Sequence, residues 1–485
     1  MPTEMRHLII LLPGFMGSVL QKDGKDLWAL SGQALWPALK TMGKSLQLLR
    51  IEKEDWQQDE LGDGIKATRV IQDLHAVPFL IEHNGYSVIL QRIPEYFDVT
   101  EGSIDQPQDE ANFFPFPWDW RRDSRVAACQ LQRFIDNQLP RWRKYSGAKD
   151  AQVILIGHSM GGLVARYYLE VLGGWRNSRA VITVGSPHRG VLGPLGLLSN
   201  GFQGGLGSLF NDLVSMGRTF ESIYQAFPTY PAIEVNGQYQ RLAETSGIPN
   251  IDQARAKAAR ENFLEAIRLA AIENRKDAAY RQRTIPWVGT RQDTPESALF
   301  SEGKLTIRNS SPAGVSESLA GGDSAVPRIS AIPADLDGDA SPIGRFVVER
   351  HGWLTNNAMA LEPLLDTVRN IASSGAQELY GSPETTQPAL NLRLEPLYLP
   401  GEPVTVTVNL VNANDQPYDL TVEAAPVRGQ GTGAKRTVQT KGVEAKSVEF
   451  GELTPGLYQL KVSAVTPAPI SAQGAFEVVD AEALE

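Results

Sequence analysis

The sequence contains little cysteine and no excess of positive charge. Cys129 is the one cysteine among 485 residues, so no disulfide bond can form within the chain. This is typical of a reducing compartment, and we expect a cytoplasmic location. Acidic residues outnumber basic ones by 56 to 46, and the net charge is −10. Such a charge argues against nucleic acid as the main partner, because phosphate binding needs a basic field.

Long hydrophobic runs are also missing. The apolar run at residues 7–12 is too short for the apolar region of a signal peptide, and Pro13-Gly14 ends it. No other stretch is long enough to span a bilayer. We therefore interpret residues 7–12 as a buried strand, and we expect any membrane contact to be peripheral.

Short apolar runs alternate with helical patterns over residues 1–375. The runs are HLIILL, YSVILQRI, AQVILIG, AVITVGS and TIPWVGT, and the helical patterns cover 124–145, 160–173 and 356–374. Short buried strands that alternate with helices predict an α/β domain with a mostly parallel sheet, covered on both faces.

The pattern changes after a linker at residues 376–388. Residues 389–485 contain alternating apolar and polar positions with Pro and Gly turns between them. This predicts a small antiparallel β-sandwich of about seven strands, of the immunoglobulin-like type. We expect this second domain to bind or position a partner that the sequence does not identify, and to take no part in chemistry.

The segment VILIGHSMGG, residues 153–162, contains a G-x-S-x-G pattern between an apolar strand and an amphipathic helix. A serine on such a sharp turn is exposed as a nucleophile, and side chains in place of the flanking glycines would collide with the neighbouring chain. We interpret Ser159 as a catalytic nucleophile. The N–H of Met160, at the start of the helix, and that of Phe15, after Pro13-Gly14, are the candidate donors to an oxyanion.

A nucleophilic serine needs a base, and in this architecture the base follows it in the chain. Only His188 and His351 do so. His351 comes directly after the strand-like run GRFVV, so we interpret it as the base. His188, in GSPHRG, is interpreted as a loop residue that lines the site.

The acid that orients the base has several candidates. Asp323, in LAGGDSAVP, is favoured by its local sequence, whereas topology favours Asp293, which follows the strand TIPWVGT. The cluster Asp335, Asp337 and Asp339 is a third possibility. Its spacing imitates the first half of a calcium loop, but the required Gly and distal Glu are absent, so we expect a solvated turn, no metal and no cofactor.

Several motifs in order resemble the lecithin:cholesterol acyltransferase-like family of lipases and acyltransferases. They are LLPGFMGS, FFPFPWDWRRD, GHSMGG, GSPHRG, RTFESIYQAFPTYP, GGDSAVP and RHG, and together they cover about residues 1–375. The resemblance implies an α/β-hydrolase fold, with Ser159 as nucleophile, Asp323 as acid and His351 as base. It also implies Phe15 and Met160 as oxyanion donors, and it favours Asp323 over Asp293. The β-rich tail lies outside it.

Two insertions and one aromatic stretch complete the expected site. Residues 190–214 are rich in Gly and Leu, and residues 251–283 have the pattern of a long charged helix. We expect both to cap the site. Trp118 and Trp120 offer flat apolar surface with an N–H group, so we expect them to line an acyl site and partly to fill the core.

The sequence thus predicts a serine esterase that acts on acyl esters, with lipids as the expected substrates. A hydrolase of a non-lipid ester or amide is one alternative, and a non-catalytic binding scaffold is another.

Overall fold

The fold is described from a computed structural model. It covers residues 2–29, 47–72, 75–77, 81–83, 85–106, 108–201, 207–336, 345–374, 388–413, 416–427, 432–442, 444–467 and 469–479. Of residues 75–77, 81–83, 207–210 and 374, the structure describes the backbone alone.

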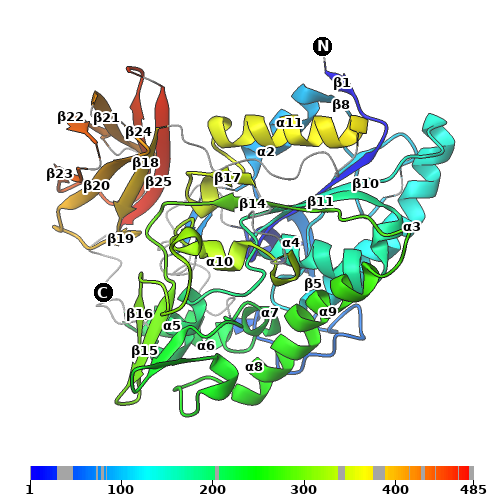
Figure 1. Ribbon diagram of the computed structural model, residues 1–485, viewed down its shortest axis with the longest axis horizontal. Coiled ribbons are helices and arrows are strands. Elements are labelled where there is room, and N and C mark those ends of the chain that lie inside the picture. The colour runs from blue at the N-terminus through cyan, green and yellow to red at the C-terminus, as the bar shows by residue number, and fades with distance from the viewer. Residues whose placement is uncertain are drawn as a thin grey trace.

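Six parallel strands form the central sheet (Figure 1). In spatial order they are β17 (Arg345–Val347), β14 (Thr284–Gly289), β11 (Ser178–Val184), β10 (Val153–His158), β2 (Leu8–Leu12) and β9 (Phe113–Pro115). Alternate residues of β10 pack into two different apolar clusters, Val153 and Leu155 on one face and Ile154 and Ile156 on the other. Strands buried on both faces read as continuous apolar runs, so the predicted parallel sheet is confirmed.

Helices cover both faces of this sheet (Figure 1). On one face lie α3 (Ser124–Ser146) and α4 (Met160–Arg166), the latter continued by a π-helical turn at Tyr167–Val171. On the other lie α2 (Ser87–Tyr96) and α11 (Ala358–Ser374). Within the described residues, no helix has both the length and the apolar character needed to cross a bilayer.

The run YSVILQRI was predicted as a strand, and this prediction is wrong, because the segment forms helix α2. Ile89, Leu90 and Ile93 are its buried residues, a spacing that places them on one side of a helix. A short apolar run is compatible with a strand or a buried helix, and here packing against α11 decides.

Smaller elements surround the sheet. Strands β1 (Thr3–Glu4) and β8 (Phe97–Asp98) form a parallel pair, and β6 (His75–Val77) and β7 (Ile81–His83) form an antiparallel one. A three-stranded sheet contains β4 (Lys25–Trp28), β3 (Ser18–Lys22) and β5 (Ile65–Val70). Short helical turns lie at Gly174–Arg176, Leu242–Glu244, Glu317–Leu319, Arg328–Ala331 (α10), Ala334–Leu336 and His351–Trp353.

The two predicted insertions form helices below the sheet. The first contains α5 (Gly193–Asn200) and α6 (Gly207–Gly217), followed by α7 (Glu221–Gln225). The second is helical over α8 (Gln253–Ala259), a π-turn (Arg260–Leu264) and α9 (Glu265–Asn274), so it ends earlier than predicted. A sheet of β13 (Gln238–Gln240), β12 (Ile233–Val235), β15 (Ser297–Ser301) and β16 (Lys304–Arg308) packs beside α5.

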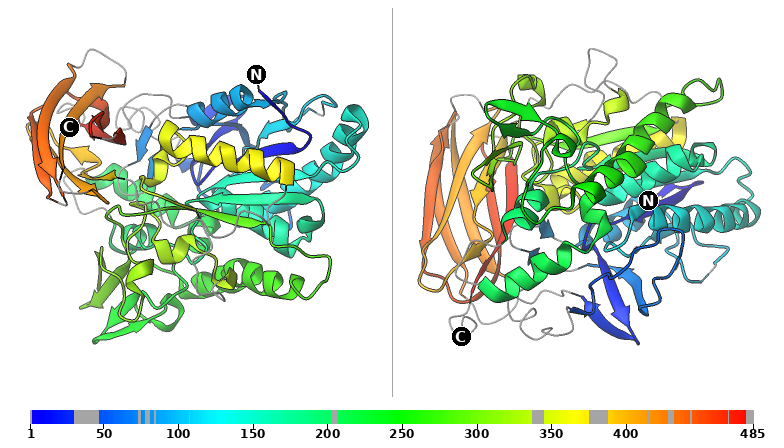
Figure 2. Two further views of the ribbon diagram at one scale, coloured as in Figure 1. Left: turned by 45° about the horizontal axis from the view of Figure 1, so that its top comes forward. Right: turned by 90° about the horizontal axis from the view of Figure 1, so that it is seen from below.

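The C-terminal strands form a separate block at one side of the molecule (Figure 2). One sheet contains β18 (Ala389–Leu394), β20 (Val404–Val411) and β23 (Lys446–Gly451). The other contains β19 (Leu397–Tyr398), β25 (Ile470–Val478), β24 (Gly456–Ala464), β21 (Pro417–Pro426) and β22 (Ala434–Lys441). Their inner faces share one apolar cluster, so the two sheets form a β-sandwich. The immunoglobulin-like type stays a prediction.

Asp335 belongs to a buried ion network. Its carboxylate accepts hydrogen bonds from Arg166, at 3.0 and 3.1 Å, and from Arg275, at 2.8 Å. Burial alone would raise the pKa of Asp335, but the charge of Arg166 and its hydrogen bonds outweigh burial and lower it. The prediction of a solvated turn is therefore wrong at Asp335. Asp337 and Asp339 lie outside the described residues.

We predict that Asp335→Asn lowers the free energy of unfolding by about 3 kcal/mol, because the buried Arg166 charge then keeps only its longer pair with Glu170, at 3.5 Å. The control is Asp150→Asn. Asp150 pairs with Arg6 at the surface, where both side chains are more than half exposed, and its loss is expected to cost about 0.5 kcal/mol or less. Urea denaturation measures both, and equal losses would contradict the network's role.

Candidate active site

The carboxyl ends of the parallel strands meet at a cavity of about 500 Å³. Ser159 follows β10, Phe15 follows β2, and His351 follows β17. All three line the cavity, together with Met160 and Pro187. Open parallel sheets place their sites at this edge, because the loops after neighbouring strands converge there.

Ser159 lies on a strained turn. Its φ is 52° and its ψ is −126°, a region that non-glycine residues rarely occupy. The backbone N–H of Ser159 donates to the carbonyl of Val184 over 2.8 Å, which ties the turn to strand β11. Helix α4 begins at the next residue, Met160. The sequence-based prediction of a sharp strand-turn-helix at Ser159 agrees with this geometry.

The glycines that flank the turn are required by close contacts. A Cβ atom at Gly157 would lie 2.4 Å from the Cα of Gly162, and one at Gly161 would lie 2.4 Å from the carbonyl oxygen of Leu12. Side-chain carbon atoms do not approach so closely without a shift of the backbone. Glycine at 157 therefore lets the helix start fold back on the end of β10, and glycine at 161 lets it sit against the end of β2.

His351 and Asp323 form a buried pair. The Nδ1–H of His351 donates to Oδ2 of Asp323 over 2.8 Å, and the backbone N–H of His351 donates to the carbonyl of Asp323 over 2.7 Å. The other carboxylate oxygen accepts the N–H groups of Ala325 and Val326, at 3.1 and 2.7 Å. With Nδ1 as donor, Nε2 is the basic nitrogen of the neutral ring.

The alternative acid, Asp293, has a different partner. Its carboxylate accepts a hydrogen bond from Nε of Arg393, over 2.6 Å, on strand β18 of the sandwich. The structure therefore brings Asp323, and not Asp293, to the ring of His351.

A directed chain of hydrogen bonds passes behind the serine. Nε2 of His158 lies 3.1 Å from the carbonyl of His351 and must donate to it, which leaves Nδ1 to accept from the hydroxyl of Tyr86, at 2.8 Å. That hydroxyl accepts the N–H of Gly14, at 2.7 Å. The chain connects the loop after β2 to the loop of His351. Burial, and then the nearby ring of His351, lower the pKa of His158 from 6.5 to about 3, so the ring is neutral.

The two candidate oxyanion donors both reach the cavity. Phe15 and Met160 are among its lining residues, and each is almost fully buried. The N–H of the neighbouring Gly14 is directed to Tyr86 instead. The role of Phe15 and Met160 as donors stays a prediction.

Trp118 and Trp120 lie behind the loop of residues 13–18. The indole N–H of Trp118 donates to the carbonyl of Pro13, at 2.8 Å, and that of Trp120 donates to the carbonyl of Ser18, at 3.0 Å. Both side chains are buried, and neither is among the described residues that line the cavity. The structure supports the prediction that these residues fill the core, and their indole groups hold the loop that carries Phe15.

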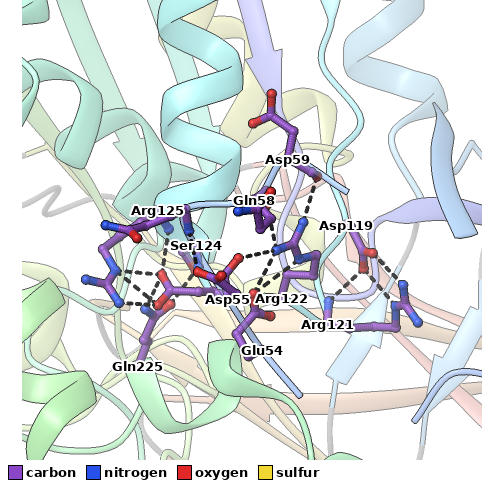
Figure 3. A network of polar contacts seen from close by, with 12 residues as sticks. Glu54, Asp55, Gln58, Asp59, Asp119, Arg121, Arg122, Ser124, Arg125 and Gln225 are labelled. Atoms are coloured by element: carbon purple, nitrogen blue, oxygen red, sulfur yellow. Dashed lines mark hydrogen bonds and ion pairs between the residues drawn. The ribbon is translucent and has the colours of Figure 1, made fainter. Parts of the chain in front are cut away.

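The charged end of the aromatic stretch is bound by the segment at residues 54–63 (Figure 3). Arg121 is fully buried and pairs with Asp119, at 2.6 Å, and with Asp63, at 3.0 Å. Arg122 pairs with Glu54, at 2.8 Å. The sequence analysis did not identify Glu54 and Asp63, because nothing in their local sequence points to partners so far along the chain.

Asp123 extends this network to helix α7, which follows the first insertion. It caps helix α3 by accepting the N–H of Arg125, and it accepts a hydrogen bond from the side chain of Gln225 over 2.7 Å. Helix α7 is thereby fixed to the aromatic stretch.

His188 does not line the cavity of Ser159, so its predicted place in the site is wrong. Its Nε2 lies 3.1 Å from the hydroxyl of Thr183, and the residue borders a second cavity together with Arg166. Burial, and then the charge of Arg166, lower its pKa well below the ordinary value.

The two insertions differ in their relation to the cavity. Helix α5 lines it with Gly193, Pro194, Gly196 and Leu197, so this part of residues 190–214 covers the site as expected. The described lining contains no residue from 251–283. That helix packs instead on the π-turn after α4, where the rings of Phe263 and Tyr167 stack at 5.5 Å. Its predicted role as a cap over the site finds no support.

We predict that the protein loses stability below about pH 6.5. In the unfolded chain His158 takes up a proton near its ordinary pKa of 6.5, whereas in the folded protein its pKa is about 3. The free energy of unfolding therefore falls as pH falls, by about 1.4 kcal/mol per pH unit for this group. His158→Gln, which can keep both hydrogen bonds, removes this part of the slope. Urea denaturation at several pH values measures it, and an unchanged slope would contradict a neutral His158.

Comparison with solved structures returned distant similarities. The propeptide form of the Bacillus licheniformis lipase BlEst2 is 12% identical, with coverage of 98% of this chain and 95% of that one, at a TM-score of 0.30. Its mature form is 12% identical over 75% of this chain and 94% of that one, at 0.29. A Paenibacillus cycloisomaltooligosaccharide glucanotransferase is 21% identical over 19% of this chain and only 15% of its own length, at 0.16.

A family model gives the informative match. The comparison with curated proteins found no match, whereas the model described as lecithin:cholesterol acyltransferase matches residues 58–266. This range includes the aromatic stretch, Ser159 and α5, and excludes Phe15, Asp323 and His351, which the fold brings to the same cavity. The match confirms the resemblance drawn from the motifs, and residues 58–266, less than half of the chain, are similar to the lecithin:cholesterol acyltransferase family.

Proposed function

We propose that the protein is a serine esterase that acts on lipid acyl esters, of the phospholipase or acyltransferase type. The observation that carries the proposal is the cavity itself. It is lined by Ser159 on its strained turn and by His351, whose ring is held by the buried carboxylate of Asp323. The match to the acyltransferase family supports the same reaction class.

In the proposed mechanism, the hydroxyl of Ser159 attacks the ester carbonyl carbon while Nε2 of His351 takes its proton. Asp323 holds the ring through Nδ1 and stabilises the imidazolium that forms. The N–H groups of Phe15 and Met160 donate to the oxyanion. The intermediate collapses to an acyl-enzyme, and the alcohol leaves with the proton from His351. Water or a second alcohol then attacks the acyl group, with His351 again as base.

The lining of the cavity favours a substrate with an acyl chain. Besides the candidate catalytic residues, much of the wall is aliphatic, with Val191, Leu197, Ile223 and Ile307 among its side chains. Such a wall gains free energy from burying methylene groups, about 0.8 kcal/mol for each. A long acyl chain therefore fits this cavity better than a charged or strongly polar ester.

We predict that Asp323→Asn lowers kcat on a soluble ester by about 10³-fold or more, because the ring of His351 loses the partner that fixes its tautomer. The matched control is Asp293→Asn, which removes only the surface pair with Arg393 and is expected to keep kcat within about twofold. Steady-state kinetics with a short-chain chromogenic ester measures both. A large loss in the control, or none in Asp323→Asn, would assign the acid elsewhere.

The substrate class is tested with phospholipid vesicles that contain a long-chain alcohol. Wild type is expected to release fatty acid or form the fatty ester, and Ser159→Ala is expected to form neither, because no acyl-enzyme can arise. The ratio of the two products separates hydrolysis from transfer. Absence of both with wild type, while a soluble ester is still cleaved, would reject phospholipid as the substrate and keep the serine esterase.

A further inference from the structure

The wall of the catalytic cavity includes residues of the C-terminal β-sandwich. Leu394 ends strand β18, Pro396 follows it, and both line the same cavity as Ser159 and His351. The sequence indicated a separate module for this domain, and the structure gives it a direct contact with the candidate active site.

Strand β18 is an edge strand, and a side chain of the first domain binds its free edge. The amide of Gln292 donates to the carbonyl of Leu390 over 3.1 Å and accepts the N–H of Leu392 over 3.3 Å. The amide of Gln292 thus makes the two hydrogen bonds that a neighbouring strand would make at this position. It pairs backbone groups of β18 that would have no partner at an exposed sheet edge. The backbone N–H of Gln292 donates to the carbonyl of Gly322, the residue before Asp323.

The loop of the base is bound to the same strand. Nη1 of Arg350, the residue before His351, donates to the carbonyl of Leu392 over 2.8 Å. The loops that carry Asp323 and His351 are therefore both hydrogen-bonded to β18, one through Gln292 and one through Arg350. These are buried contacts, which hold the sandwich in a defined position at the cavity.

The apolar cores also join across this boundary. Val479, at the end of the sandwich, is fully buried and belongs to the main apolar cluster of the first domain, and Leu397 packs against that cluster. A domain that only tethers a partner needs no such shared core. The segment from Leu394 to Leu397 is thus fixed on both sides of Pro396.

We propose that the C-terminal β-sandwich forms part of the acyl-binding wall, with Pro396 as a specificity-determining residue for acyl-chain length. The proposal rests on the proposed esterase function. Pro396 is half-buried at the cavity, where it faces the same space as the aliphatic side chains of α5. The chain length accepted by the enzyme is then set jointly by the insertion and by the sandwich.

The test uses the full chain and compares Pro396→Trp with Leu399→Trp. Leu399 lies three positions further along, is 39% exposed, and is absent from the described lining. kcat/KM is measured on nitrophenyl acetate and nitrophenyl palmitate, with Ser159→Ala as the blank. Pro396→Trp is expected to lower the palmitate-to-acetate ratio by about tenfold or more, because the indole fills part of the cavity. Leu399→Trp is expected to keep the ratio of wild type.

An unchanged ratio in Pro396→Trp, or an equal change in both variants, overturns the proposal. If the Trp variant does not fold, Pro396→Ala decides, because the smaller side chain must shift the ratio towards palmitate. Failure here is separate from failure of the esterase function. Acetate cleavage that Ser159→Ala abolishes keeps the function whatever the ratio is, whereas no Ser159-dependent cleavage of either ester rejects both.

Discussion

The close approach of helix α4 to the end of strand β2 is the contact on which the site depends. Gly161 packs against the carbonyl groups of Leu12 and Pro13 with no room for a Cβ atom. This approach places the turn of Ser159 beside the loop of Phe15, and it leaves Ser159 in a conformation that costs about 1–3 kcal/mol. The surrounding sheet supplies that energy, since the strands on either side of β10 are buried on both faces.

Buried arginine residues hold the segments that surround the turn of Ser159. Arg121 and Arg166 are both fully buried, and each is neutralised by two carboxylates. In each case burial opposes the charge, yet the neighbouring carboxylates raise the pKa above its ordinary value. Pairs of this kind contribute little to net stability, but they are costly to break, so they fix which segments lie together. Arg121 binds Asp63 and the carbonyl of Leu49, and Arg166 is linked through Asp335 to Arg275, the residue that follows α9.

The sequence predicted the parts of the site that are defined by local pattern. The turn of Ser159, the order of Asp323 and His351, and the parallel strands depend on spacing and on short motifs, and the structure agrees with them. What failed depends on contacts that a local pattern does not contain. YSVILQRI is apolar enough for either a strand or a helix, and only its neighbours decide. Trp118 and Trp120 donate to carbonyl groups in the loop at residues 13–18. The sequence around the two tryptophans does not identify these partners, so it could not predict that neither side chain lines the cavity.

The hydrogen bonds from Gln292 and Arg350 to strand β18 have a consequence for the order of assembly. A ribosome makes the chain from its N-terminus, so residues 1–375 emerge before β18 exists. The loops of Asp323 and His351 gain their bonds to Leu390 and Leu392 only when β18 has been released and folded. The loops of Asp323 and His351 are therefore held in place only after residues 389–394 have been made, whereas the residues around Ser159 emerge much earlier.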